Sequence, residues 1–406
     1  MSYLSTGSIS YLSDGDIEWS RPKEEEFVPK NEAEEQLFAR ISEAAKSLQI
    51  HIDAGAAART IAYGIRQDQQ TPGHKVSASD TNGESPRNLM YIQDGRDTVV
   101  VAHLNKESRG DRNLGEDGSM GKSLKFAIAY NTRTDNISVY VVNSYAPLSD
   151  SEAEALRPNR RQMMRAGEKK QLTARHSAQN ESRVLERLDG APHTLPLVAT
   201  VQGTGKNGQP KVYALLPFCE GGDLSGVIQS KTLTRKEKLR IAIDILKGAE
   251  EMHRAGIVHR DLTSRNIFFQ NGIPVIADFD LASDVDQVIF DSHGTPTIRP
   301  PEFMKQQGAK CTPESDVYSL GCTLHELLFD GEVLIEEALK RQGKENLNPY
   351  ALLSSLMGLS EDPMIEPENK DSFEHVIFEM TRLNPEARIT LPEARARLER
   401  MLTGMD

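Results

Sequence analysis

The sequence predicts an α+β protein in which a small β-rich part precedes a larger, mainly helical part. β-Branched residues gather in three runs, DTVVVAHL (97–104), KFAIAY (125–130) and ISVYVVN (137–143), and such runs are typical of strands. The last two flank NTRTDN and are interpreted as a hairpin. From Leu239 to Met252 apolar residues recur every three or four positions, which indicates a helix with one buried face.

A polar extension comes before the first strands. Residues 1–32 are polar and acid-rich, and this composition predicts a disordered arm. In residues 33–88 the spacing of Leu37, Ile41 and Leu48 indicates a helical segment, and QQTPGHKVSASDTNGESPRN (69–88) indicates a linker. Residues 89–403 are then expected to form the main folded part, with its first lobe ending near 217 and its second beginning near 222.

Composition restricts the classes of partner. The formal net charge is −12, so neither nucleic acid nor an anionic membrane surface is expected as a partner. Three cysteines without a CxxC pair suit a reducing compartment, and we expect a cytoplasmic protein. No apolar run has the length of a membrane span, and MSYLSTGSIS lacks the basic and apolar regions of a secretory signal.

The segment from Asn143 to about Ser177 is rich in basic residues. One interpretation is a solvated helix and loop, as most charged runs are. The other is a docking surface for an acidic partner, through residues 144–176 or through the N-terminal extension.

The residues that carry chemistry follow the long helix, which opens with a Thr234-x-x-Glu237 capping box. The stretch GIVHRDLTSRNIFF (256–269) contains Asp261 and, five residues later, Asn266; PVIADFD (274–280) then brings Asp278 at the end of a strand. Phosphoryl transfer needs a carboxylate to orient and deprotonate the attacking hydroxyl. It also needs oxygen ligands that hold Mg²⁺ against the phosphates. Asp261 suits the first role, and Asn266 and Asp278 suit the second.

These motifs resemble those of the eukaryotic-type protein kinase family, with HRD, the asparagine after it and a DFG-like triplet. The resemblance implies a two-lobed fold, ATP and Mg²⁺ as cofactors, and a protein as substrate. Downstream, GTPTIRPPE (294–302), SDVYSLG (315–321) and LNPEARIT (383–390) are similar to later family motifs. By that resemblance Asp316 braces the catalytic loop through backbone N–H groups, and Glu302 forms a buried ion pair with Arg388.

Upstream segments extend the resemblance to the nucleotide site. LLPFCEGGDL (215–224) looks like the hinge, with Leu216 as gatekeeper, the Cys219 backbone at the adenine and Asp223 near the ribose. NESRVLERL (180–188) looks like the mobile helix of the first lobe, with Glu181 at its ion-pair position and Leu185 facing the core.

Two departures from the family pattern bear on activity. The metal motif reads Asp278-Phe279-Asp280, with aspartate in the place of glycine, so the backbone there loses the freedom of glycine. Tyr140 stands at the position where we expect the phosphate-binding lysine. The alternative to an active kinase is therefore a pseudokinase that binds nucleotide or a partner. A third class, transfer of a nucleotidyl group on the same fold, also remains open.

The glycine-rich stretch NLGEDGSMGKS (113–123) is a poor P-loop, because five residues instead of four separate Gly115 from Gly121. As a kinase glycine loop it provides Gly115, Gly118 and Gly121 for the phosphates. Lys122 and Lys125 follow at the start of the next strand. Alternation of faces allows only one of them to point inward and replace the missing lysine. The register is left open, and the alternative is that both lysines are solvated residues at the strand edge.

Specificity and regulation have mixed signals. Arg265, four residues after Asp261, follows the tyrosine-kinase and tyrosine-kinase-like pattern, whereas Thr295 is typical of serine/threonine kinases. We expect serine/threonine specificity. The segment 281–299 contains Ser283, Ser292, Thr295 and Thr297 as candidate phosphorylation sites.

Overall fold

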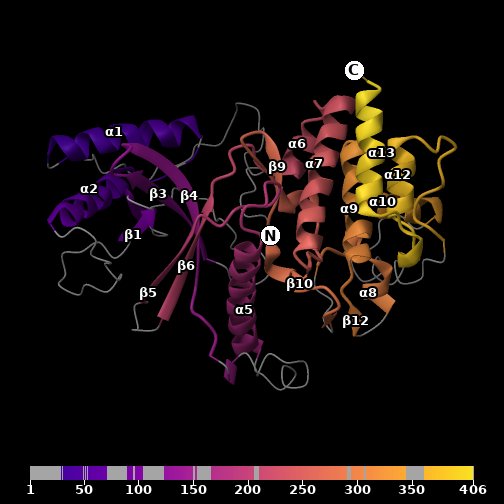
Figure 1. Cartoon of the computed structure of the whole chain (residues 1–406), viewed down its shortest axis with the longest axis horizontal. Helices are drawn as coiled ribbons and strands as arrows, with labels where there is room; N and C mark the ends of the chain where they lie inside the picture. The colour runs from indigo at the N-terminus through magenta and orange to yellow at the C-terminus, as the bar shows by residue number, and fades with distance from the viewer. Residues whose placement is uncertain are drawn as a thin grey trace. The chain divides into compact units, whose positions relative to one another are not determined.

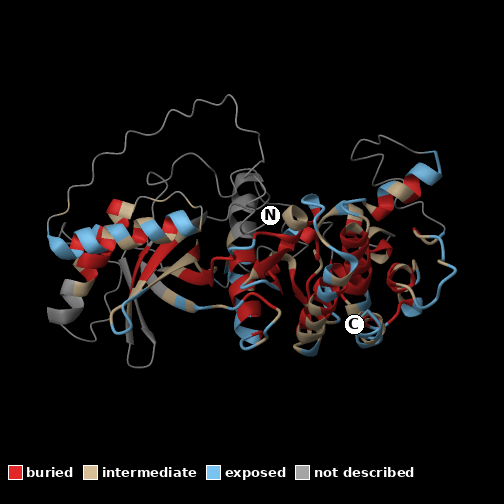
Figure 2. Ribbon diagram, turned by 90° about the horizontal axis from the view of Figure 1, so that it is seen from above, coloured by how far each residue is buried: buried red, intermediate tan, exposed pale blue. Residues whose placement is uncertain are grey.

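The computed structural model describes residues 29, 31–48, 50, 52, 54–70, 89–94, 97–103, 123–149, 151–152, 166–204, 210–289, 294–305, 308–343 and 361–405. These residues form two compact units (Figure 1). The sheet unit comes from Tyr11–Ser182 and Leu197–Phe218, and the helical unit from Arg183–Pro196 and Cys219–Asp406. The predicted α+β, two-lobed fold is thereby confirmed. Figure 2 shows buried residues inside each unit and exposed residues on the outer sides of the helices.

The sheet unit is built on six antiparallel strands in the order β1-β2-β3-β4-β6-β5. Their bounds are β1 Leu89–Asp94, β2 Asp97–His103, β3 Ser123–Asn131, β4 Asn136–Tyr145, β5 Ala199–Thr204 and β6 Pro210–Pro217. β3 and β4 form the predicted hairpin. Its turn is set by Asn131, whose side-chain oxygen accepts bonds from the N–H groups of Arg133 and Thr134, both at 3.0 Å.

Two helices of the predicted extension pack on this sheet. α1 (Glu32–Ser47) begins with Asn31, whose side chain accepts a bond from the Glu34 N–H, and α2 is Ala54–Gln70. Leu37 and Ile41 of α1 and Ile61 of α2 are buried with Val100 and Ile128 from the strands. The predicted helical segment is therefore two helices that share a core with the sheet. The predicted arm at 1–32 falls almost entirely outside the described residues.

The basic segment 144–176 is only partly described. β4 ends at Tyr145, and α5 (Ala166–Arg187) covers its last part. Arg175, described in α5, bonds to Glu152 at 2.7 Å and to the Ala146 carbonyl at 2.8 Å. Residues 153–165 lie outside the described residues, and the docking role of this segment stays a prediction.

The helical unit is organised around α7 (Arg235–Arg254) and α9 (Pro313–Leu328). The predicted capping box opens α7: Thr234 and Glu237 each bond to the other's backbone N–H. The other α-helices in the described part of this unit are α6 Leu224–Gln229, α8 Pro301–Lys305, α10 Leu334–Arg341, α12 Phe373–Met380 and α13 Leu391–Thr403. Three short antiparallel pairs lie among them: β7 Ile257–Val258 with β10 Ser283–Asp284, β8 Ile267–Gln270 with β9 Ile273–Ile276, and β11 Val288–Ile289 with β12 Ala309–Lys310.

Candidate active site

The loop that carries Asp261 follows β7, and one buried carboxylate binds its backbone. Asp316, on α9, is fully buried. Its two oxygens accept the backbone N–H groups of His259 at 2.8 Å and Arg260 at 2.9 Å. This is the bracing role that the sequence predicted for Asp316. The bonds fix the backbone immediately before Asp261, in spite of the left-handed φ of 72° at Arg260.

A third group at Asp316 was not predicted. His253, in the last turn of α7, approaches the same carboxylate with its Nε2 at 2.9 Å. Burial alone would raise the pKa of Asp316, but the bond from His253 and those from the loop lower it below its ordinary value. Since His253 is on α7 and Asp316 on α9, only the fold reveals this contact.

Asp261 itself is oriented by two partners. One carboxylate oxygen accepts the Thr295 N–H at 2.8 Å, and the other lies 3.3 Å from the Asn266 Nδ2. Asn266 also donates to the Asp261 carbonyl at 2.8 Å. Because its amide nitrogen is committed to Asp261, the oxygen of Asn266 is the atom that this side chain can offer to a metal ion.

Asp278 lies two residues after the end of β9, in a left-handed conformation with φ 64°. The next residue, Phe279, is fully buried and packs on the His259 ring, with ring centroids 5.0 Å apart. His259 thus packs against Phe279 and braces the metal motif. Asp280 lies in the short 3-10 helix η4 (Phe279–Leu281) and is not among the residues of positive φ. An aspartate at this position is therefore compatible with the backbone, although glycine is the family's usual residue.

The helical unit thus brings together three of the predicted side chains, Asp261, Asn266 and Asp278. A backbone hydrogen bond joins the segments that carry Asn266 and Asp278, because the Ala277 N–H donates to the Asn266 carbonyl at 2.9 Å. A carboxylate and an amide oxygen are ligands that suit Mg²⁺. A bound Mg²⁺ would supply charge neutralisation for phosphate oxygens, while Asp261 would orient a hydroxyl and accept its proton.

The position of the missing lysine needs a correction. Tyr140 pairs with Pro217 across the sheet and packs on the cluster that contains Ala127 and Val142. The residue that reaches Glu181 is Asn143, whose Nδ2 donates to the Glu181 carboxylate at 2.8 Å. Successive residues of a strand face opposite sides, so Tyr140 and Asn143 cannot share a face. Matching the family's V-A-I-K pattern to Tyr140–Asn143 would have found this position from the sequence.

The surroundings of Asn143 are closed to solvent. Asn143 is 1% exposed and Glu181 2% exposed. Within the described residues the Asn143 Oδ1 atom has no hydrogen-bond partner. α5 is therefore linked to β4 through Glu181, with a neutral amide in the place of a cation. Leu185, one turn after Glu181, is buried as predicted.

The glycine loop lies mostly outside the described residues. Gly115, Gly118, Gly121 and Lys122 all belong to that part of the chain. Lys125 lies in β3, where its backbone pairs with Val142, and its neighbour Leu124 pairs with Asn143. The register of this strand is thus known from position 123 onward.

The predicted hinge residues are divided between the two units. In the sheet unit, Leu216 on β6 is buried. In the helical unit, the Cys219 carbonyl accepts the Gly222 N–H at 3.2 Å. Asp223 caps α6 by accepting the Gly226 N–H at 2.8 Å. Its burial raises its pKa, against that bond and the charge of Arg265. Capping explains the position of Asp223, and a role at a ribose stays a prediction.

Glu302 and Arg388 form the predicted ion pair. Both guanidinium nitrogens of Arg388 bond to the two Glu302 oxygens at 2.8 Å. The Arg388 side chain is 0% exposed and that of Glu302 is 22% exposed. The pair joins α8 to the segment before α13.

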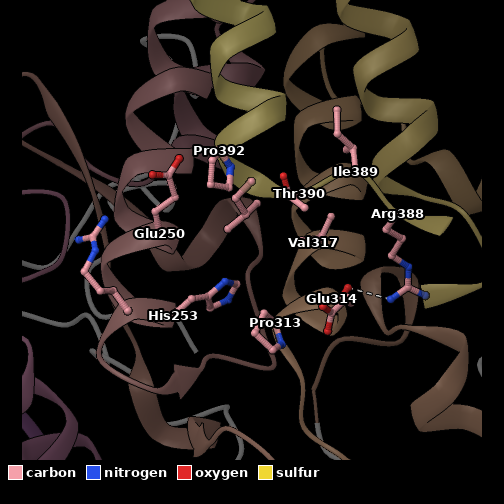
Figure 3. Close-up of a pocket in the computed structure, with 11 residues that line it drawn as sticks. Glu250, His253, Pro313, Glu314, Val317, Arg388, Ile389, Thr390 and Pro392 are labelled. Carbon is pink, nitrogen blue, oxygen red and sulfur yellow. Dashed lines mark hydrogen bonds between the residues drawn. The ribbon is translucent and has the colours of Figure 1, made fainter. Parts of the chain in front are cut away.

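A pocket of about 320 Å³ lies beside this pair, between α7, α9 and the start of α13 (Figure 3). His253, Glu314, Val317, Arg388 and Pro392 are among the residues that line it. Neither Asp261 nor Asp278 lines it. The pocket is therefore separate from the candidate catalytic residues.

Comparison with known proteins agrees with this geometry. The family model described as "Protein kinase domain" matches residues 161–398, which is more than half of the 406 residues. The chain belongs to the protein kinase family, and the resemblance drawn from its motifs is confirmed.

Several serine/threonine kinases match the chain over shorter stretches. Serine/threonine-protein kinase Nek11 of Mus musculus is 36% identical over 122 residues, 27% of this chain and 18% of the relative. Mitogen-activated protein kinase hog1 of Aspergillus glaucus is 32% identical over 188 residues, 45% of this chain and 49% of the relative. Serine/threonine-protein kinase PLK4 of Xenopus tropicalis is 30% identical over 186 residues, 44% of this chain and 18% of the relative. The chain thus spans less than half of the length of each. None of the helices in the described part combines the length and apolar character that crossing a membrane requires.

Proposed function

We propose that this protein transfers the γ-phosphate of ATP, with Mg²⁺, to serine or threonine hydroxyls of a protein substrate. The observation that carries the proposal is the set of bonds at Asp261, whose two oxygens are held by Thr295 and Asn266. A carboxylate held in this way is oriented toward a hydroxyl before the substrate arrives, so little reorganisation is needed during the reaction. Family membership and the names of the matching serine/threonine kinases support the choice of substrate hydroxyl.

Asp278 and Asn266 are proposed as the metal ligands. Leu216, the Cys219 backbone and Asp223 are proposed to line the adenosine site, and Gly115, Gly118 and Gly121 to cover the phosphates. Since the neutral Asn143 stands opposite Glu181, the cation that contacts the α- and β-phosphates must come from another residue.

Lys122 is the better of the two candidates for that cation. Leu124 pairs with Asn143 across β3 and β4, and cross-strand partners lie on the same face. Lys122 has the parity of Leu124, whereas Lys125 has the opposite parity. We therefore propose Lys122, rather than Lys125, as the phosphate-binding lysine.

The test is transfer of radiolabel from ATP to a general protein substrate by the purified full chain. Label from the γ-position should be transferred by the wild type, and Asp261→Asn should reduce transfer at least about 10²-fold, the low end of general-base effects. Nucleotide affinity should stay unchanged, since Asp261 is not a ligand of ATP. Asp278→Asn should instead weaken Mg²⁺-dependent nucleotide binding.

Three outcomes would contradict the proposal in different ways. Mg²⁺-independent nucleotide binding without transfer by the wild type would favour the pseudokinase alternative. Retention of label from the α-position would indicate nucleotidyl transfer. Equal transfer by wild type and Asp261→Asn would remove Asp261 from the role of base.

A further inference from the structure

The first half of the segment between Asp280 and Pro300 is held against its neighbours in the helical unit by an acidic side chain. This segment, residues 281–299, is called the activation segment below. Within it, Ser283 and Asp284 form β10 and pair with Val258 and Ile257 of β7. The Val285 N–H then donates to the Gly256 carbonyl at 3.0 Å. The backbone of 283–285 thus runs along the strand that leads into the catalytic loop.

The Asp284 carboxylate gathers arginines from the end of α5. Arg187 bonds to Asp284 through one guanidinium nitrogen, and Arg183, one turn earlier, lies 3.6 Å from the same oxygen. The second nitrogen of Arg187 donates to the Ala255 carbonyl at 2.6 Å. Arg187 therefore links three segments: the end of α5, the turn between α7 and β7, and the activation segment.

A third arginine holds the residue before Asp284. Arg260, directly before the proposed base, donates to the Leu281 carbonyl at 3.0 Å and to the Ser283 hydroxyl at 3.2 Å. In all of these contacts the residues of the activation segment are unphosphorylated. A phosphate group orders such a segment by adding negative charge that arginines can bind. Here the Asp284 carboxylate already contacts Arg187 and Arg183.

We propose that Asp284 is a positioning residue that replaces an activating phosphate: it binds Arg187 and Arg183 and holds the activation segment in place without phosphorylation. The proposal rests on the proposed kinase function. Its consequence is a catalytic loop whose geometry does not depend on the phosphorylation state of the chain. The bond from Arg187 lowers the pKa of Asp284, against partial desolvation, so the carboxylate is charged at neutral pH.

Asp286 offers a matched control for substitution. It lies two residues after Asp284, in the turn that follows β10. Its side chain is 72% exposed, and the Lys310 ammonium lies 4.0 Å from its carboxylate. Asp286→Asn removes the same charge two residues further along the chain, where the contact within the described residues is with Lys310 and not with an arginine. Asparagine also tolerates the left-handed φ of 64° at this position.

The kinetic experiment compares kcat and the KM for ATP in the wild type, Asp284→Asn, Asp284→Glu and Asp286→Asn, before and after treatment with a protein phosphatase. We expect wild-type kcat to survive the treatment, with loss of phosphate verified by mass spectrometry. Asp284→Asn should lower kcat roughly five- to tenfold with KM for ATP within about twofold, because only charge-assisted bonds at a partly exposed site are lost. Asp284→Glu should recover part of the loss, and Asp286→Asn should match the wild type.

Hydrogen exchange of residues 281–289 keeps the proposal testable if no transfer is detected. Asp284→Asn should speed exchange in this stretch, and Asp286→Asn should not. Arg187→Ala combined with Asp284→Asn should add little to either single change. Failure of the proposed function would show as absent transfer with this exchange pattern intact. The proposal itself is overturned if phosphatase treatment abolishes wild-type activity, or if Asp284→Asn and Asp286→Asn exchange alike.

Discussion

Removal of the Arg388 side chain should lower the thermal stability of the protein clearly. Arg388 is fully buried and forms a two-pronged ion pair with Glu302. Its guanidinium also donates to the carbonyls of Arg382 at 2.8 Å and Glu314 at 2.7 Å, and it lies 5.0 Å from the centre of the Tyr318 ring. Arg388→Ala therefore leaves a carboxylate and two carbonyls without these partners.

The magnitude follows from burial. Removing one partner of a buried pair costs about 3–5 kcal/mol. Glu302 is 22% exposed and keeps the bond from the Ser315 hydroxyl at 3.1 Å, so water and Ser315 partly compensate and the lower end applies. At about 3 kcal/mol, the melting temperature of a domain of roughly 150–250 residues falls by about 6–12 °C.

Thermal unfolding followed by circular dichroism gives the measurement, and an exposed pair gives the control. Arg235 bonds to Glu374 at 3.0 Å with 49% and 27% of the two side chains exposed. A surface pair of this kind contributes about 0–1 kcal/mol, so Arg235→Ala should shift the melting temperature by no more than about 4 °C. If Arg388→Ala lowers it no further than Arg235→Ala does, the ion pair is not the buried connection inferred here.

Two further substitutions test the catalytic site. Lys122→Ala should reduce ATP turnover severely and Lys125→Ala should not, because only position 122 has the strand parity of Leu124; the reverse result, or no loss in either variant, would reject the proposed lysine. Asp316→Asn should destabilise the fold at neutral pH, because the lowered pKa of Asp316 adds stability that is present above the unfolded-state pKa and is lost as pH falls through the folded-state value. Melting temperatures measured from pH 7 down to pH 3 should therefore converge for wild type and Asp316→Asn, and a constant difference would contradict the assignment.

The chemistry of the helical unit was largely predictable from the sequence, because its residues lie close together along the chain. Asp261 and Asn266 are five residues apart, and the short strands and turns between them leave few possible geometries. The motif order also identified Asp316 and the Glu302–Arg388 pair, although only by resemblance. His253 was missed because its partner is 63 residues away, and nothing in the helical periodicity of α7 distinguishes it.

Contacts between distant segments that match no family motif could not be predicted from the sequence. The periodicity of residues 33–65 predicted helix, yet it could not tell that α1 and α2 would pack on the sheet, since any apolar face would satisfy the same pattern. Arg187 and Asp284 are 97 residues apart, and each alone is an ordinary charged residue. For such pairs the fold supplies the information, because a charge is a positioning group only when its partner lies within reach.

The strand carrying Asn143 illustrates how much depends on register. A reading displaced by three residues selected Tyr140, and an odd displacement in a strand exchanges one face for the other. Asn143 provides Glu181 with a neutral donor. The position therefore contributes no positive charge for the phosphates. The pairing of Leu124 with Asn143 turns this loss into a choice between two lysines, because only residues of even number on β3 share the face of Asn143. A single shift of register would select Lys125 instead, and for this reason the activities of the two alanine variants test the strand pairing as well as the source of the cation.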